Sequence, residues 1–399
     1  MTIRALTVML HAPPRPVPKT NEAWMSPPEI AQTLSQQLLS SLVQQGFDPS
    51  LFDTLAASIG SDPDARNRLT TGVTPPAADD ILDLPPAGSD EYHQLSRLGL
   101  EALACGQLAF VVLAGGMATR MGGVVKGLVH ALNHQSFLDL RLIENLVWSK
   151  RAGRDIPLWL MTSHATDSAL REALGSHLEG DRLATFRQNL SLRLNPDGSL
   201  FHASDGSPSV YAPGHGDLPD ALRRAGLLER FVQRGGKVVW VANIDNLGAG
   251  IDPVILGWHL RHGAPVSVEV VDKIGTDRGG IPVRLDDRPV ILEEFRLPRD
   301  FDPSQVRVFN TNTFLIDARL LATSRFDFTW VQVTKQVDGA KAIQFERLLG
   351  EITTALDTRF LRVPRQGTTS RFLPVKDNDE LAFRRDEIQT VLKARGVLP

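Results

Sequence analysis

The chain has 399 residues, of which 42% are hydrophobic and 22% charged, and its formal net charge is −3. A chain of this length and composition can bury a large core without disulfides or structural metals. The small negative charge excludes an extended basic surface, so we expect no nucleic-acid partner. The single cysteine, Cys105, excludes an internal disulfide framework and favours a reducing compartment.

The first residues carry no convincing export signal. Met1–Thr20 holds one short apolar run followed by prolines, without a signal-peptide core or cleavage site. No apolar stretch reaches the roughly 18 residues that a membrane-spanning helix needs. We therefore expect a cytoplasmic protein with no membrane partner.

Residues 1–105 are predicted to form a helical N-terminal region. Prolines before Glu29 can start a helix there, because proline suits the first helical turn. Thr74–Gly88 is rich in Pro, Ala and Asp and is interpreted as a linker, and Tyr92–Leu103 as another helix. The apolar residues at helical spacing in the first helix are Ile30, Leu34, Leu38, Leu39 and Leu42.

Residues 106–330 alternate apolar strands with helices. The first strand, Leu108–Ala114, is continuously apolar, as expected for a strand covered on both faces. This alternation predicts an α/β fold with a doubly wound, mostly parallel sheet. The other predicted strands are Pro157–Met161, Lys237–Ile244, Pro265–Val271 and Val306–Ile316. The predicted helices are one capped by Ser136, Asp167–Leu178 and Asp217–Arg234.

Two segments depart from this alternation. Arg278–Phe295 is predicted to be a hairpin that turns at Asp286 and Asp287. Residues 331–399 form a mixed C-terminal part, with a helix predicted near Ala340–Leu356 and a charged helix near the end.

The segment Phe110–Lys126, FVVLAGGMATRMGGVVK, follows the first buried strand with two glycine pairs. Glycines at the carboxyl end of a parallel strand let backbone N–H groups approach phosphate oxygens. Arg120 and Lys126 add positive charge for a triphosphate. A tight glycine turn would need neither cation, so the combination predicts a phosphate-binding loop. Neither GxxxxGK[ST] nor GxGxxG is present, which argues against the two commonest nucleotide loops.

The loop resembles the LAGGxxTRxG…K signature of sugar-nucleotide pyrophosphorylases, and its ending also resembles the molybdenum-cofactor guanylyltransferases. Four later segments resemble motifs of the UTP–glucose-1-phosphate uridylyltransferase family and occur in that family's order. They are Ala212–Asp217 (APGHGD, for the family's PPGHGD), Asn243–Ala249 (NIDNLGA), Phe309–Asn312 (FNTN) and Arg371–Lys376 (RFLPVK). The resemblance implies the sheet of the nucleotide-diphospho-sugar transferases, which is Rossmann-like, with residues 106–330 as its catalytic core.

The resemblance also implies residue roles. Asp245 is predicted to be the Mg²⁺ ligand, and a carboxylate at the end of a buried strand suits that role independently. The predicted catalytic cations are Arg120, Lys126 and Lys376. The predicted nucleotide-binding residues are Leu113, Ala114, Gly115, Gly116, Gln188 and Gly214. The predicted sugar-phosphate residues are His215, Asn243, Gly280, Glu293, Asn310 and Asn312.

The implied reaction is attack by a sugar 1-phosphate on the α-phosphorus of UTP, which releases pyrophosphate. Glucose 1-phosphate is the first choice of acceptor. Ala114 and Ala118 stand where glucose-specific members carry Asn and Gly, and Ala114 instead resembles the N-acetylhexosamine uridylyltransferases. The run from Gly122 to Lys126 is also one residue shorter than in either branch.

Three alternatives stay open: an N-acetylhexosamine 1-phosphate acceptor, transfer of another nucleotide to a non-sugar phosphate, and a nucleotide sensor without turnover. The family usually carries a C-terminal left-handed β-helix, often used in oligomerisation. The residues after Lys376 leave no room for it. We therefore expect no C-terminal β-helix and either a monomer or a differently built dimer.

Overall fold

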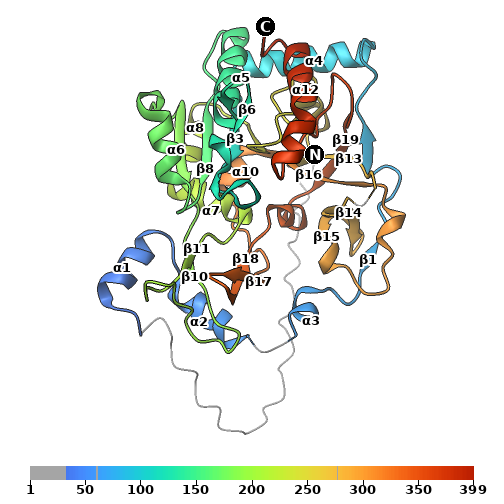
Figure 1. Ribbon diagram of the computed structural model, residues 1–399. Coiled ribbons are helices and arrows are strands. Elements are labelled where there is room, and N and C mark those ends of the chain that lie inside the picture. The colour runs from blue at the N-terminus through green and yellow to red at the C-terminus, as the bar shows by residue number, and fades with distance from the viewer. Residues whose placement is uncertain (1–32, 60–61, 276) are drawn as a thin grey trace, which may run out of the picture.

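The computed structural model describes residues 33–59, 62–275 and 277–399. Within them, an eight-stranded, mostly parallel sheet runs through the molecule and is accompanied by helices (Figure 1). This confirms the predicted α/β architecture. In spatial order the strands are β2 (Ile81–Asp83), β19 (Thr358–Arg362), β13 (Val266–Asp272), β16 (Val308–Asp317), β12 (Val238–Asn243), β3 (Leu108–Leu113), β8 (Leu158–Thr162) and β9 (Leu183–Arg187).

The centre of the sheet explains where a ligand can bind. β3 is buried over its whole length and pairs in parallel with β8 on one side and β12 on the other. The chain first runs outward from β3 to β8 and β9 and later returns to β12, so the strand order reverses between β3 and β12. Crevices at such a reversal, beyond the carboxyl ends of the strands, are where open α/β sheets bind ligands. β16 lies beyond β12 and is antiparallel to both of its neighbours.

The described helices begin and end largely where local signals predict. The helix after Ser136 starts with a capping box, in which Ser136 and Asp139 each accept a hydrogen bond from the other's backbone N–H. The helices are α1 (Gln36–Gln44), α2 (Pro49–Ala57), α3 (Pro63–Asn67), α4 (Asp90–Ala104), α5 (Phe137–Ala152), α6 (Asp167–Leu174), α7 (Leu218–Arg224), α8 (Leu227–Gln233), α9 (Pro253–His262), α10 (Ala318–Thr323), α11 (Ile352–Ala355) and α12 (Asn378–Ala394).

The predicted helix Asp217–Arg234 is in fact two helices, α7 and α8. Gly226 interrupts it with a φ of 65°, a left-handed conformation that ends one helix before the next begins. The start predicted at Glu29 lies outside the described residues, and the first described helix, α1, is capped by Ser35.

The hairpin predicted within Arg278–Phe295 is confirmed. β14 (Gly280–Leu285) and β15 (Arg288–Glu293) pair around Asp286 and Asp287, whose φ values of 48° and 63° suit a tight hairpin turn. β1 (Val73–Thr74) adds a third strand on the outer side of β14. The linker interpretation of Thr74–Gly88 is therefore wrong, because this segment reaches β1 and contains β2, an edge strand of the main sheet. Both strands are short and pair with partners far along the chain, so the local sequence gives little sign of them.

The helix predicted near Ala340–Leu356 is also wrong. β17 (Val331–Val337) and β18 (Ala340–Glu346) form a hairpin instead, and only the short helix α11 follows. Asp338 and Gly339 turn the hairpin with φ values of 50° and 81°, as Asp-Gly pairs commonly do. Ile343 and Phe345 of β18 are buried in a second, smaller hydrophobic cluster with residues of α1 and α2.

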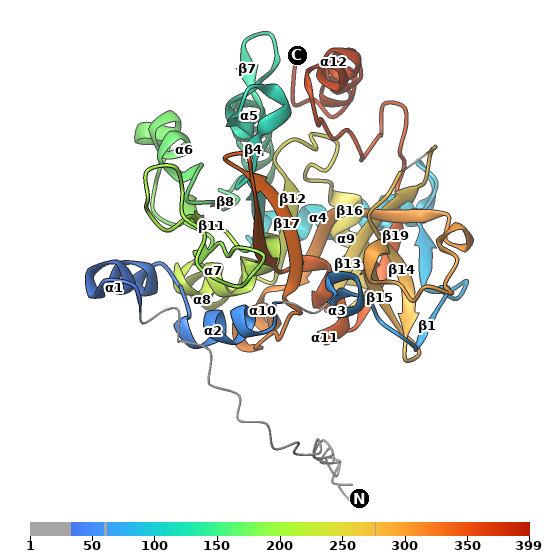
Figure 2. The same ribbon diagram turned by 60° about the horizontal axis from the view of Figure 1, so that its bottom comes forward.

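This second cluster lies at one end of the molecule (Figure 2). The N-terminal helices α1 and α2 lie there near α7, whereas β1, β14 and β15 lie on the other side of the same end (Figure 2). A short ladder of β10 (Ser191–Leu192) and β11 (Val210–Tyr211) contributes to the cluster and leads from the main sheet toward it. Among the described residues, no helix is both long enough and apolar enough to cross a membrane.

Candidate active site

A cleft of about 340 Å³ opens where the carboxyl ends of the central strands meet. The parallel register aligns Leu113 of β3 with Asn243 of β12 and with Met161 of β8, so the residues that follow these strands share one edge of the sheet. The structure brings together at this cleft nine of the predicted site residues, namely Leu113, Gly115, Gly116, Lys126, Gln188, Gly214, His215, Asn243 and Asp245.

The loop after β3 is held mainly by its own backbone. β4 (Met117–Ala118) pairs with β5 (Val124–Val125), and the N–H of Lys126 donates to the carbonyl of Gly116 at 3.2 Å. This folds the loop back so that Lys126 faces the cleft. Ala114 is buried, and its N–H donates to Met161 of the neighbouring strand. Arg120 is exposed on the short 3₁₀ turn Thr119–Met121 and does not line the cleft.

An ion pair joins the two loops that follow β3 and β12. Lys126 Nζ lies 2.6 Å from Asp245 Oδ2, and the backbone N–H of Val375 donates to the same oxygen at 3.2 Å. Three segments that are far apart in the chain therefore meet at one carboxylate. Lys376, the next residue, is exposed, and its backbone N–H donates to Glu380 of α12.

The loop after β12 is fastened to the segment before Lys376. Asn246 donates from Nδ2 to the carbonyl of Arg371 and accepts at Oδ1 from the N–H of Leu373, at 3.2 and 2.7 Å. A Cβ on Gly248 would lie 2.7 Å from the backbone of Arg371, so the close approach requires glycine there. Asp245 and Lys376 are thus carried by two loops with a fixed spacing.

Buried charges behind these loops were not anticipated from the sequence. Arg371 is fully paired with Glu269 of β13, at 2.6 and 2.9 Å. Arg141 of α5 donates to the carbonyls of Asn243, Asn246 and Ala249 and pairs with Glu144. The sequence gives one sign of these buried charges, which is Glu269 inside the apolar run Val266–Val271. A carboxylate buried in such a run needs a cationic partner.

The turn Gly214–Asp217 packs closely against the segment that follows β18. A Cβ on Gly214 would lie 2.8 Å from the carbonyl oxygen of Arg347, and the N–H of Gly216 donates to that oxygen. His215 Nδ1 accepts the N–H of Leu349 at 2.9 Å, and burial lowers the pKa of His215 to about 4. The neutral ring therefore carries its proton on Nε2, where it can donate to a ligand.

Gln188 follows the edge strand β9 and is almost fully buried against the phosphate loop. Gly115 has no side chain there, and any Cβ on it would overlap Gln188 Nε2. The hydroxyl of Ser163 donates to the carbonyl of Gly115 at 2.8 Å and holds the loop from the other side. The side-chain amide of Gln188 thus sits directly beside the glycines of the cleft.

The predicted asparagines of β16 reach the cleft through Asn243. Asn312 donates from Nδ2 to Asn243 Oδ1 at 2.9 Å, and its own N–H donates to Asn310 Oδ1. Asn312 has a φ of 59°, at a point where the register between β13 and β16 shifts. This bulge turns the side chain of Asn312 toward β12.

The structure does not place Gly280 and Glu293 in the same cleft. They pair with each other across the β14–β15 hairpin, and Glu293 lines a separate, wider hollow of about 830 Å³. Burial raises the pKa of Glu293 to about 7, and the neighbouring Glu294 adds to this rise. Glu293 therefore holds a proton close to neutral pH.

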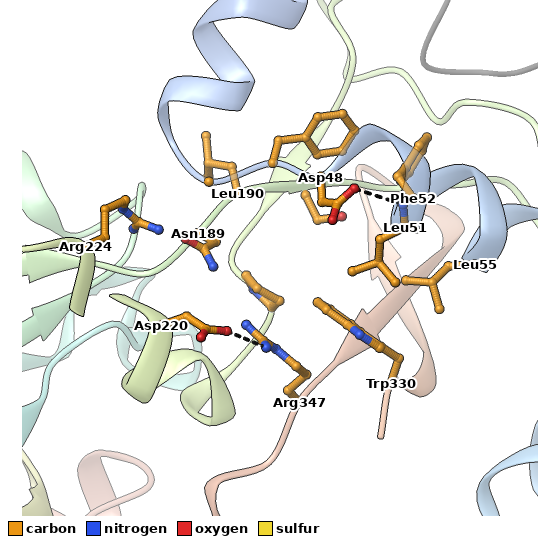
Figure 3. A pocket seen from close by; sticks show the side chains of 14 residues that line it. Asp48, Leu51, Phe52, Leu55, Asn189, Leu190, Asp220, Arg224, Trp330 and Arg347 are labelled. Atoms are coloured by element: carbon orange, nitrogen blue, oxygen red, sulfur yellow. Dashed lines mark hydrogen bonds and ion pairs between the residues drawn. The ribbon is translucent and has the colours of Figure 1, made fainter. Parts of the chain in front are cut away.

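Figure 3 shows another hollow, of about 270 Å³, behind the Gly214–Asp217 turn and beside α2. Arg347 lies 4.8 Å from the centre of the Trp330 ring and pairs with Asp220 at 2.8 Å and with Asp217. Most charged side chains that line this hollow, among them Arg347 and Asp220, are already paired within the protein. The ion pairs therefore serve to hold the back of the turn.

Few of the described side chains at the cleft could bind a metal ion. In the described part of the chain, no group of three or more His, Cys, Asp or Glu side chains could hold a metal ion. Asp245 Oδ2 accepts from Lys126 and Val375, while Oδ1 accepts no hydrogen bond from the described residues. One carboxylate oxygen beside phosphates fits Mg²⁺, which commonly binds through one or two carboxylates together with substrate phosphates and water.

Comparison with known proteins adds curated relatives over most of the chain. A protein named UTP–glucose-1-phosphate uridylyltransferase from Astragalus penduliflorus is 30% identical over 328 residues, which cover 78% of this chain and 67% of the relative. Proteins of the same name from Musa acuminata and Saccharomyces cerevisiae are also 30% identical. They are covered over 63% of their length, so this chain spans less than two thirds of these relatives.

Solved structures share the fold. A UDP-glucose phosphorylase from Trypanosoma brucei matches with a TM-score of 0.70 and 22% identity, over 87% of this chain and 77% of that one. The UDP-N-acetylglucosamine pyrophosphorylase of the same organism matches with a TM-score of 0.71 and 20% identity, over 89% and 79%. The model of one family, described as UTP–glucose-1-phosphate uridylyltransferase, matches residues 70–394. The chain therefore belongs to the UTP–glucose-1-phosphate uridylyltransferase family.

Proposed function

We propose that this protein transfers the uridylyl group of UTP to glucose 1-phosphate, forming UDP-glucose and pyrophosphate. The observation that carries this proposal is the meeting of Lys126, Asp245 and the N–H of Val375 at the reversal of strand order. Family membership and the names of the curated relatives support the same reaction.

The nucleotide half of the proposal rests on the side of the cleft formed by β3 and β9. Gly115 and Gly116 offer backbone N–H groups to phosphates without a Cβ in the way. Gln188 offers an amide that can pair with the donor and acceptor edge of uracil. Its burial against Gly115 holds that amide beside the phosphate loop, which supports binding of a whole nucleotide rather than of phosphate alone.

The sugar-phosphate half rests on His215, Asn243 and the asparagine chain from β16. A neutral His215 donates Nε2–H to an anionic oxygen without needing to be protonated. Asn243 is oriented by Asn312, which leaves its Nδ2 available for the acceptor. We assign Gly280 and Glu293 to the hydroxyl groups of the sugar; of the two, Glu293 lines the wider hollow.

The reaction needs little proton transfer. An oxygen of the sugar phosphate attacks the α-phosphorus of UTP, a new P–O bond forms, and the bond to the β-phosphate oxygen breaks as pyrophosphate leaves. The attacking oxygen is already an anion, so positioning and neutralisation of charge supply most of the catalysis. Lys126 is placed for this role, and Lys376 and Arg120 would have to approach from their exposed positions. When bound at Asp245, Mg²⁺ would neutralise phosphate charge.

A second candidate acceptor is an N-acetylhexosamine 1-phosphate. Ala114 favours it in the sequence, and structures titled UDP-N-acetylglucosamine pyrophosphorylase share the fold as closely as the glucose enzymes do.

We further propose a doubly wound sheet of the Rossmann-like nucleotide-diphospho-sugar transferase type, which the strand reversal between β3 and β12 supports. Three further points stay predictions from the sequence. They are domain limits near residues 105 and 330, a cytoplasmic location, and a monomer or atypical dimer.

The deciding experiment is pyrophosphate release measured over a grid of nucleoside triphosphates and sugar 1-phosphates, with and without Mg²⁺. We expect release with UTP and glucose 1-phosphate that depends on Mg²⁺, and a weaker signal with the N-acetylhexosamine phosphates. The Asp245→Ala protein serves as the background control. Release that prefers GTP or CTP, or none with any hexose 1-phosphate, would contradict the proposal.

A further inference from the structure

The guanidinium of Arg395, just after α12, bridges the two loops that carry Asp245 and Lys376. Its Nη1 donates to the carbonyl of Gly248 at 2.7 Å, and its Nη2 donates to the carbonyl of Ser370 at 2.8 Å. One side chain therefore joins the end of the β12 loop to the start of the segment Arg371–Lys376.

Arg395 makes these bonds without an ion pair among the described residues, which is unusual for a guanidinium so enclosed. Burial, and to a smaller extent the nearby Arg371, lowers the pKa of Arg395 to about 10. At neutral pH the group still carries all of its donors. Asp252, Glu144 and Glu269 lie near enough to favour its charged form, but none of them makes an ion pair with it in the described part of the chain. Arg395 instead faces two carbonyls in the fork geometry that suits bidentate contacts.

The position of Arg395 is itself fixed. Arg151 of α5 donates to the carbonyls of Arg395 and Gly396, at 2.9 and 3.0 Å. Ile388 and Val391 are fully buried and hold α12 against the core. The bridge therefore transmits the position of a packed helix to both loops.

We propose that Arg395 is a positioning residue that holds Asp245 and Lys376 at the spacing the reaction needs. The inference rests on the proposed uridylyl transfer, because it assigns a role within that site. Arg395 touches neither substrate nor reacting atoms. It acts through the backbone of Gly248 and Ser370. Without it the bonds of Asn246, Arg371 and Val375 still join the two loops, but neither loop is tied to the C-terminal end of α12.

The test compares Arg395→Ala, Arg395→Lys and the matched control Arg385→Ala, which removes an exposed arginine of the same helix. For Arg395→Ala we expect kcat to fall ~10- to 100-fold, because an ångström-scale misplacement of catalytic groups costs rates of that order. The KM for UTP should stay near its original value, since the cleft at Gln188 is untouched. Arg395→Lys keeps the positive charge but lacks the two guanidinium nitrogens that donate to both carbonyls, so we expect intermediate turnover. Arg385→Ala should behave like the unmodified protein.

A second measurement is independent of activity. Hydrogen exchange of the ligand-free protein should show faster exchange in Arg395→Ala at the amides of Ala249, Leu373 and Val375, with β12 itself still protected. If Arg395→Ala does not fold, the exchange and kinetics of Arg395→Lys take its place.

Each outcome decides the proposal. Unchanged exchange in both loops, unchanged kcat, or full recovery of kcat by Arg395→Lys would overturn the bridging role. A change in KM alone would do the same. If the unmodified protein shows no uridylyl transfer but the exchange result appears, the bridge stands and the proposed function fails.

Discussion

The loops after β3 and β12 meet at one cleft but are built in opposite ways. The β3 loop is largely open: a Cβ on Gly116, Gly122 or Gly123 would meet nothing within 4 Å. The β12 loop is buried at every residue from Ile244 to Ile251, and charged side chains from three other elements hold its carbonyls.

This difference between the two loops indicates which parts of the site are formed before a ligand binds. Asp245 is held in a closed network with Lys126 and the N–H of Val375, so its carboxylate is already positioned. Arg120, Gly116, Gly122 and Gly123 are exposed, so ligand contacts can still adjust this part of the β3 loop. A rigid carboxylate beside a more open loop would combine preorganised charge with room for the proposed UTP substrate to enter.

The largest expected effect is loss of stability when the closed network is broken. Glu269→Gln leaves Arg371 as a buried charge without its partner, so the free energy of unfolding should fall by ~3–5 kcal/mol. Urea unfolding followed by circular dichroism measures it. The matched control is Asp357→Asn at the exposed pair with Arg288, where less than about 1 kcal/mol is expected. A loss below 1 kcal/mol for Glu269→Gln would show that the network does not hold the loop.

The second effect is kinetic and compares the two sides of the cleft directly. Lys126→Met should lower turnover by ~10²–10³-fold, because it removes a fixed positive charge next to the reacting phosphates. Steady-state pyrophosphate release measures it. Arg120→Ala should lower turnover less than Lys126→Met does if the β3 loop keeps its ligand-free conformation. If the loop closes on UTP, the two variants should lose turnover equally. Near-normal turnover of Lys126→Met would remove the ion pair from the mechanism.

The third expected effect is a pH dependence of stability that arises from Glu293, which lies outside both loops. The folded-state pKa of Glu293 lies near 7, above its ordinary value of 4.5, so the native state binds this proton more tightly than the unfolded state. Stability from this group is fully present below pH 4.5 and falls by up to about 3 kcal/mol as the pH rises through 7. Glu293→Gln should flatten that part of the profile in urea unfolding between pH 4 and pH 8. An unchanged slope would contradict the assignment.

The smallest expected effect is a difference in stability between alanine substitutions at two glycines, one in each loop. A Cβ on Gly250 would overlap Glu144 Oε1, so Gly250→Ala should cost ~1–3 kcal/mol of stability by overpacking. Gly116→Ala has open space and should cost less than about 0.5 kcal/mol, as surface substitutions do. Its effect should appear instead in weaker UTP binding by calorimetry. Equal stability losses would mean that the two loops are not built differently.

Much of the site could be predicted because its residues follow strands with strong local signals. Apolar runs place β3 and β12, and Asp245 and Lys126 follow them at short distances along the chain. The asparagines of β16 and the turn at His215 were predicted from motifs, and the structure adds the contacts that orient them. Gly280 and Glu293 were predicted together with the others but do not line the same cleft, because the hairpin they belong to is part of a separate three-stranded sheet.

The sequence by itself determined the elements whose signals are local: the buried strands, the capping box at Ser136 and the hairpin at Asp286 and Asp287. Only the tertiary structure decided the pairing of β17 with β18, the edge strand β2 and the partners of Arg371 and Arg395. Arg371 and Glu269 are separated by 102 residues, and the apolar run around Glu269 indicates its burial without indicating its partner. Their burial depends on which strands lie side by side, and that is set by the packing of the whole chain rather than by any segment of it.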